Sequence, residues 1–149
     1  MAITKERRNQ LIRLADEALK AKDDILKANK DKEGKTSWNI LESYNGQVAS
    51  LSVSIAMSGL LPTLAIFYQD KPESNQKKAY RRNVIEVVAR MITTDPEKEW
   101  DFSAEGKYAY NLMKYAVNPA NAEKLDGLKN EMVECAIALK LVVRTYNLL

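Results

Sequence analysis

The sequence contains no histidine and a single cysteine, Cys135. Without histidine the chain lacks the commonest general base and metal ligand, which excludes Ser–His, Cys–His and His-ligated zinc sites. One cysteine excludes an intramolecular disulfide and a cysteine-based zinc cluster. The composition therefore disfavours an enzyme, and we expect no catalytic residue, no metal site and no cofactor.

Glycine and proline are also scarce, with five Gly and four Pro among 149 residues. These numbers are too low for a typical all-β protein or a disordered chain. The length suits one domain, and 46% hydrophobic and 29% charged residues are ordinary for a globular protein. We therefore expect a single helical domain over residues 1–149.

No charged residue falls between Ser43 and Gln69, a stretch long enough to cross a bilayer. Polar side chains are interspersed along it, however, and Gly59 and Pro62 interrupt it, so a buried helical hairpin is the favoured interpretation. The first residues also lack the apolar core of a signal peptide. We expect a cytoplasmic protein that makes no membrane contact.

Apolar residues recur at steps of three and four along most of the chain, and no alternating strand pattern accompanies them. This periodicity is typical of amphipathic helices packed around one core. We therefore predict an all-α protein, a compact single-domain bundle of about six helices. The predicted helices cover approximately residues 4–30, 37–59, 61–70, 75–93, 108–116 and 125–146.

Local signals mark several helix ends. Thr36 or Ser37 can cap the second helix, and Gly59 can take the left-handed conformation that ends it. Asp95-Pro96 and Asn118-Pro119 each combine a capping side chain with proline, which is tolerated at the first helical position. We expect at most a short turn after Asp95.

The net charge of +3 permits nucleic-acid binding without requiring it, so the distribution of charge matters more than the total. Residues 71–82 hold five cationic and one anionic side chain, whereas residues 95–105 hold five anionic and one cationic. This polarity suits a protein that contacts both an anion and a basic neighbour. The surrounding stretch 94–107 is predicted to be a mobile loop.

The densest cationic group consists of Lys77, Lys78, Arg81 and Arg82. Residues four apart lie one above the other on a helix, so these side chains form two adjacent pairs on one surface. Such a surface suits phosphates, while Tyr80 would face the core. The alternative is a solvated helix face near the acidic 95–105 stretch. The N-terminal cations, which are more dispersed, are expected to be solvated: Lys5, Arg7, Arg8 and Arg13.

A family resemblance lies between Ser43 and Lys71, where a helix of small and aliphatic residues ends in Gly59-Leu60. The short apolar helix Leu64-Ala65-Ile66-Phe67 follows. This arrangement resembles the small all-helical subunit of type III-B CRISPR RNA-silencing (Cmr) complexes. The total length, the long N-terminal helix and the amphipathic last helix are similar too, and Lys140 matches a cation near the end of the family's last helix.

The resemblance implies a non-catalytic subunit of a CRISPR effector ribonucleoprotein for antiviral defence. Its partners would be the other effector subunits, further copies of itself in a filament, and the guide and target RNA. Copies would stack beside the backbone subunits and line the groove that receives target RNA. The expected RNA-binding residues are Lys77, Lys78, Arg81 and Arg82, with Lys140 and Arg144, one turn further on, as a second group.

Two other functions remain open at the level of sequence. One is the equivalent small subunit of the sister type III-A complex, which is also short, basic and helical. The other is a helical adaptor or dimerisation module that binds no nucleic acid.

Overall fold

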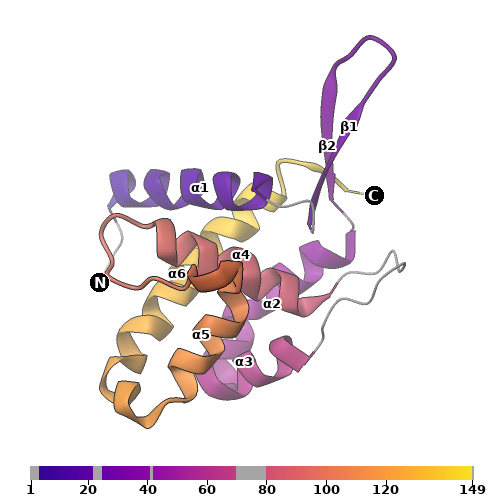
Figure 1. Ribbon diagram of the computed structural model, residues 1–149. Helices are drawn as coiled ribbons and strands as arrows, with labels where there is room; N and C mark the ends of the chain where they lie inside the picture. The colour runs from indigo at the N-terminus through magenta and orange to yellow at the C-terminus, as the bar shows by residue number, and fades with distance from the viewer. Residues whose placement is uncertain (1–3, 22–24, 41, 70–79, 149) are drawn as a thin grey trace.

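The computed structural model describes residues 4–21, 25–40, 42–69 and 80–148 (Figure 1). Six α-helices form a compact bundle in this part of the chain, which confirms the predicted all-α class. The helices are α1 (Lys5–Lys20), α2 (Glu42–Ser58), α3 (Leu60–Gln69), α4 (Arg81–Thr94), α5 (Tyr108–Val117) and α6 (Leu125–Val143). Two short 3-10 helices, η1 (Ala104–Gly106) and η2 (Pro119–Lys124), flank α5.

The core lies around α6, which packs against α1, α2 and α4. The face of α2 that enters this core consists of Tyr44, Val48, Leu51 and Ile55, all buried at the predicted steps of three and four. Burial of such a stripe supplies most of the stability of a helix in a globular protein. Cys135 is fully buried on α6 and serves as a small apolar side chain.

The connection between α2 and α3 follows the sequence signals closely. Gly59 has φ +90°, a left-handed conformation in which a Cβ atom would be strained. Pro62 then falls in the first turn of α3, where its missing N–H is tolerated. Among the described residues, no helix is long and apolar enough to cross a membrane.

The predicted first helix is too long, because α1 ends at Lys20 and an antiparallel hairpin follows it. Strands β1 (Leu26–Lys30) and β2 (Thr36–Ile40) pair in register from Leu26 opposite Ile40 to Lys30 opposite Thr36. The expected cap at Thr36 or Ser37 is therefore wrong. The Asn, Thr and Ser residues of this segment are weak helix formers, and burial of the strand ends decides the outcome.

The hairpin turn is set by Asp31 and Gly34. One carboxylate oxygen of Asp31 accepts the backbone N–H of Glu33 at 2.9 Å and that of Lys35 at 2.8 Å. Gly34 takes φ +81°, which glycine adopts without a steric penalty. The two-residue strand β3 (Asn147–Leu148) pairs in parallel with β2, because α6 ends at Val143 rather than at 146.

The predicted end of α4 agrees with its last residue, Thr94, whereas its start differs, because Tyr80 is extended. The helix is described from Arg81, and the predicted stretch 75–79 lies outside the described residues. Asp95 ends α4, and its carboxylate accepts the N–H of Glu97 at 3.0 Å, so the predicted capping side chain and the short turn after Asp95 are both present. Asn118 is likewise the predicted N-cap and accepts the N–H of Ala120 at 3.0 Å.

The segment predicted to be a mobile loop, 94–107, is anchored to the core at several points. Phe102 is buried and meets the ring of Tyr115 edge-on at 5.7 Å between centroids. Trp100 donates its indole N–H to the hydroxyl of Tyr115 at 3.1 Å. The N–H of Phe102 is bound by the hydroxyl of Thr93 at 2.9 Å. This connection is therefore a packed element of the fold.

Candidate nucleic-acid interface

Two of the predicted RNA-binding residues, Arg81 and Arg82, lie where α4 begins and α3 ends. Arg82 donates its Nε–H to the backbone carbonyl of Tyr68 at 2.6 Å, and its guanidinium lies 3.7 Å from the centre of the Tyr68 ring. Arg81 is exposed, with its guanidinium 6.0 Å from the ring of Phe67. Lys77 and Lys78 lie outside the described residues.

The start of α4 is held by the buried tyrosine of α2. The hydroxyl of Tyr44 accepts the backbone N–H of Tyr80 at 3.1 Å and the side-chain amide of Asn83 at 2.6 Å. Tyr80 is buried, as predicted from its place opposite the cationic face. These hydrogen bonds hold the first turn of α4, from which the side chains of Arg81 and Arg82 project.

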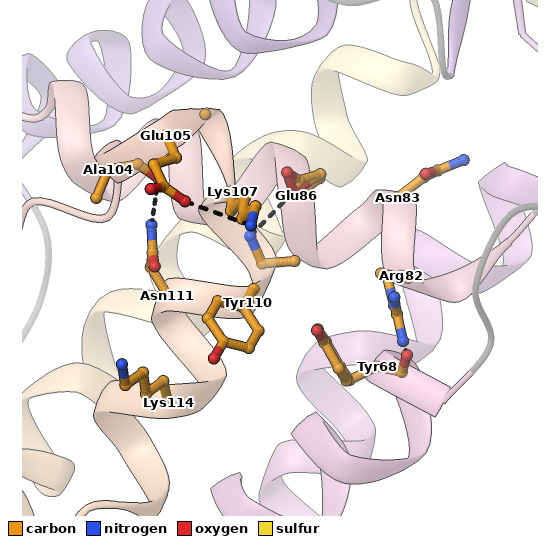
Figure 2. A pocket seen from close by; sticks show the side chains of 12 residues that line it. Tyr68, Arg82, Asn83, Glu86, Ala104, Glu105, Lys107, Tyr110, Asn111 and Lys114 are labelled. Atoms are coloured by element: carbon orange, nitrogen blue, oxygen red, sulfur yellow. Dashed lines mark hydrogen bonds and ion pairs between the residues drawn. The ribbon is translucent and has the colours of Figure 1, made fainter.

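A cleft of about 850 Å³ opens beside Arg82, between the end of α3, the first half of α4, η1 and α5 (Figure 2). We refer to it as the basic–aromatic cleft. Its charged lining consists of three cations and two carboxylates, and tyrosines contribute from α3 and α5. These side chains are Arg82, Lys107, Lys114, Glu86, Glu105, Tyr68 and Tyr110.

Hydrogen bonds to the backbone of η1 and α5 fix the walls of this cleft. Glu86 on α4 accepts the N–H of Ala109 at 2.9 Å, which satisfies a donor in the first turn of α5. The side-chain amide of Asn111 donates to the carbonyls of Phe102 and Ala104 at 2.8 and 2.9 Å. The cleft is therefore shaped by the fold itself.

The rim of the cleft combines an aromatic surface with exposed cations. Tyr110 is 47% exposed, and the ammonium of Lys114 lies 6.0 Å from its ring. Lys107 is exposed and pairs with Glu105 at 3.3 Å, a surface ion pair that water screens. Proteins that bind single-stranded nucleic acids combine cations, which contact phosphates, with accessible aromatic rings, on which bases stack.

Sequence reasoning missed the contribution of α5 to this surface. The available signal was the pair Tyr110 and Lys114, four residues apart and opposite the apolar residues Leu112 and Ala116. Their proximity to Arg82 depends on the packing of α4 against α5, which spacing along one helix cannot predict.

The second predicted group, Lys140 and Arg144, does not line the cleft. Lys140 is half-buried in the last turn of α6, and Arg144 is the exposed residue that caps the same helix. This end of α6 leads into β3 beside the hairpin (Figure 1), whereas Arg82, in the first turn of α4, is bound to the carbonyl of Tyr68 in the last turn of α3. The described members of the first group, Arg81 and Arg82, thus lie on a different surface from Lys140 and Arg144.

A second cluster of charges is buried at the N-terminal end of α1. It shows that the expectation of a solvated Arg7 was wrong. The Arg7 side chain is 14% exposed and binds both oxygens of Asp95, which is fully buried. It also contacts Glu97 at 2.8 Å and the buried Glu131 of α6 at 3.3 Å. The other N-terminal cations Lys5, Arg8 and Arg13 are exposed, as expected.

The two buried carboxyl groups, those of Glu131 and Asp95, have pKa values shifted in opposite directions. Burial, together with the neighbouring charge of Asp95, raises the pKa of Glu131 to about 8. Burial alone would raise the pKa of Asp95 as well, but hydrogen bonds from Arg7 and Glu131 lower it to about 2. At neutral pH a protonated Glu131 therefore lies beside an ionised Asp95 that Arg7 neutralises.

This cluster joins α1, the α4–α5 connection and α6, and its chemistry is that of a structural contact. The thiol of Cys135 lies 3.8 Å from Glu131, and burial raises the pKa of that thiol, so it is not an activated nucleophile. Among the described residues, no group of three or more potential ligands could hold a metal ion.

Comparison with known proteins identifies the family. Residues 14–143 match the family described as CRISPR-associated protein (Cas_Cmr5). No curated protein and no solved structure matches the chain. The match extends from the second half of α1 to the last residue of α6, and it agrees with the resemblance seen around Gly59-Leu60. The chain therefore belongs to the Cas_Cmr5 family of CRISPR-associated proteins, the small helical subunits of type III-B Cmr complexes.

Proposed function

We propose that this protein is a non-catalytic subunit that stacks in several copies beside the backbone subunits of the type III-B complex and lines the groove for target RNA. The observation that carries this proposal is the family match over residues 14–143. The basic–aromatic cleft beside Arg82 supports it with a surface whose chemistry suits RNA.

The cleft would contact mainly the sugar–phosphate backbone of the RNA. Lys107 and Lys114 on the rim of the cleft, and Arg81 next to Arg82 on α4, are exposed and can pair with phosphates, while the exposed ring of Tyr110 can stack on a base. Arg82 contributes charge from a fixed position against Tyr68. Such contacts read shape and charge, and base pairing between guide and target would read the sequence.

Lys77 and Lys78 lie four and three residues before Arg81 in the sequence and would extend the same cationic surface. Lys140 and Arg144 would form a second RNA contact on another face of the molecule. One subunit neutralises few phosphates, so we expect weak RNA affinity for the free protein and stronger binding after assembly, when copies act along one strand.

The test begins with the affinity-tagged protein expressed in cells that carry the remaining subunits and a guide. The proposal expects the other effector subunits and guide RNA to copurify. A variant with Arg81→Ala, Lys107→Ala and Lys114→Ala should assemble normally but crosslink less to target RNA. Lys5→Ala with Arg8→Ala and Arg13→Ala, three exposed cations of α1, is the matched control and should behave like the wild type.

Two outcomes would contradict the proposal. If the tagged protein isolates no effector subunit and no RNA, the assignment to the complex is wrong for this chain. If the cleft variant binds RNA normally but is lost from the complex, the cleft is a protein–protein interface and the RNA groove lies elsewhere.

A further inference from the structure

The hairpin of residues 26–40, which we call the prong, projects from the helical body (Figure 1). Its base is fixed, because Leu26 and Ile40 are fully buried and β3 pairs with β2 at Ile40. Its tip is not covered by the rest of the chain, since residues 30–36 are all exposed. Because Asp31 binds two amides of the turn, the tip has a defined shape.

The tip carries both signs of charge, with cations in the majority. Lys30, Lys32 and Lys35 are exposed there, together with Asp31 and Glu33. Because two carboxylates lie among the three lysines, the tip is a weaker site for a polyanion such as RNA than a purely cationic surface of the same size would be. A protein surface with the reverse pattern can pair with each charge in turn, so the tip favours an acidic protein partner of mixed charge.

The chain itself carries such a surface in residues 97–105, which we call the acidic turn. Its exposed carboxylates are Glu97, Glu99, Asp101 and Glu105, and the exposed cation among them is Lys98. The turn is held in shape by the buried side chain of Phe102 and by Asp101, which accepts the N–H of Ser103 at 2.9 Å. The prong tip and the acidic turn thus carry net charges of opposite sign, and each has a defined shape.

These two surfaces lie at opposite ends of α1. Arg7, near the start of α1, contacts Asp95, which precedes the acidic turn, and Glu97, which belongs to it. Lys20, in the last turn, lies 5.7 Å from the ring of Trp38 in the prong. The 16 residues between these ends correspond to about 24 Å of helix. A contact between the surfaces must therefore join two molecules.

We infer that the prong of one copy docks on the acidic turn of the next copy. The two surfaces differ, so the contact is heterologous and repeats head to tail, and it generates an open filament when the rotation between copies does not close a ring. This inference rests on the proposed function, because it names the surfaces through which the stacked copies of the subunit meet.

Crosslinking tests the geometry directly. A Lys32→Cys, Glu99→Cys variant, treated in the purified effector complex with a bismaleimide of about 10 Å span, should give a ladder of covalent multimers of this chain. Each single variant alone should give no self-crosslink, and a mixture of the two should stop at dimers. Cys135 is buried and does not compete.

Charge reversal tests the energetics. Lys32→Glu with Lys35→Glu should weaken association between copies roughly tenfold or more, by the loss and inversion of several ion pairs. Glu99→Lys with Glu105→Lys on the partner copy should restore it. Arg8→Glu with Arg13→Glu changes the same number of charges on the middle of α1 and should have no effect.

Three results would overturn the inference: no ladder, a self-crosslink from either single variant, or a crosslink from the prong to RNA or to another subunit. None of these results alters whether the chain copurifies with the effector subunits. Failure of the head-to-tail contact is thereby distinguished from failure of the proposed function.

Discussion

Arg7 illustrates how one side chain can organise three separate segments. It binds Asp95 after α4, Glu97 in the following turn and Glu131 on α6. A buried ion pair adds little net stability compared with an apolar replacement, but removal of one partner leaves a charge without compensation. The cluster therefore fixes the position of the α4–α5 connection more than it strengthens the fold.

Substitution of this arginine tests that view. Arg7→Ala leaves the ionised Asp95 buried without its cation, and we expect a loss of about 3 kcal/mol in the free energy of unfolding. Urea denaturation followed by circular dichroism measures this change. Arg8→Ala, an exposed neighbour, should change stability by less than about 0.5 kcal/mol. Equal effects of the two substitutions would show that the buried cluster is energetically unimportant.

The same cluster predicts how stability depends on pH. Glu131 stays protonated in the folded protein up to a pKa of about 8, whereas in the unfolded chain it ionises near its ordinary pKa, which is several units lower. Between these two values the folded state binds more protons, so the free energy of unfolding falls as pH rises. Asp95 has the opposite sign, and its contribution is lost as pH falls toward its folded pKa of about 2.

Glu131→Gln should remove the first of these dependences, because a neutral amide can still donate a hydrogen bond to Asp95 but does not titrate. We expect the wild type to lose at least about 1 kcal/mol of stability between pH 5 and pH 8 relative to this variant. Thermal or urea unfolding across that range measures the difference. Glu123→Gln, at an exposed position of η2, is the control and should retain the wild-type slope.

At the scale of elements, α2 was predictable because its burial follows its own periodicity. Leu51 occupies the centre of the buried stripe and is fully enclosed. Leu51→Asp would place an unpaired charge in the core, and we expect it to unfold most of the bundle. Far-UV circular dichroism at 25 °C measures the loss. Val53→Asp, at an exposed position of the same helix, should remain folded.

The prong behaves differently, because a local hydrogen-bond pattern sets its turn while the core fixes its base. Asp31→Ala removes the side-chain acceptor of the Glu33 and Lys35 amides. We expect faster hydrogen exchange at these two amides and nearly unchanged helical content, because the tip lies outside the core. Protection that is unchanged in the turn would mean that Gly34 and strand pairing define it without Asp31.

At the scale of the whole molecule, the cleft variant should change how RNA binding responds to salt. Each phosphate contact made to single-stranded RNA contributes roughly 0.7 to the slope of log K against log salt concentration. Removal of Arg81, Lys107 and Lys114 should therefore flatten the slope measured for the assembled complex. The decrease should be the same for every matched target sequence. A sequence-dependent loss would argue that the cleft reads bases.

The sequence by itself determined the class of the fold and the positions of several helix ends. Steps of three and four place Leu51 and Cys135 in the core, Gly59 ends α2 and Asn118 caps η2, all through contacts within a few residues. Local geometry and side-chain chemistry suffice for such features. The Gly59-Leu60 segment carried the family resemblance for the same reason, since it is a local pattern.

Only the tertiary structure decided the features that join distant segments. The chain leaves the helical path after Lys20 because the ends of the hairpin, Leu26 and Ile40, are buried against the body. Arg7 is paired because residues about ninety positions away along the chain fold against it. The cleft likewise needs α5 beside α4 to bring Lys114 and Tyr110 near Arg82. Burial and desolvation of charge are properties of the packed chain, so the spacing of residues within one segment could not predict them.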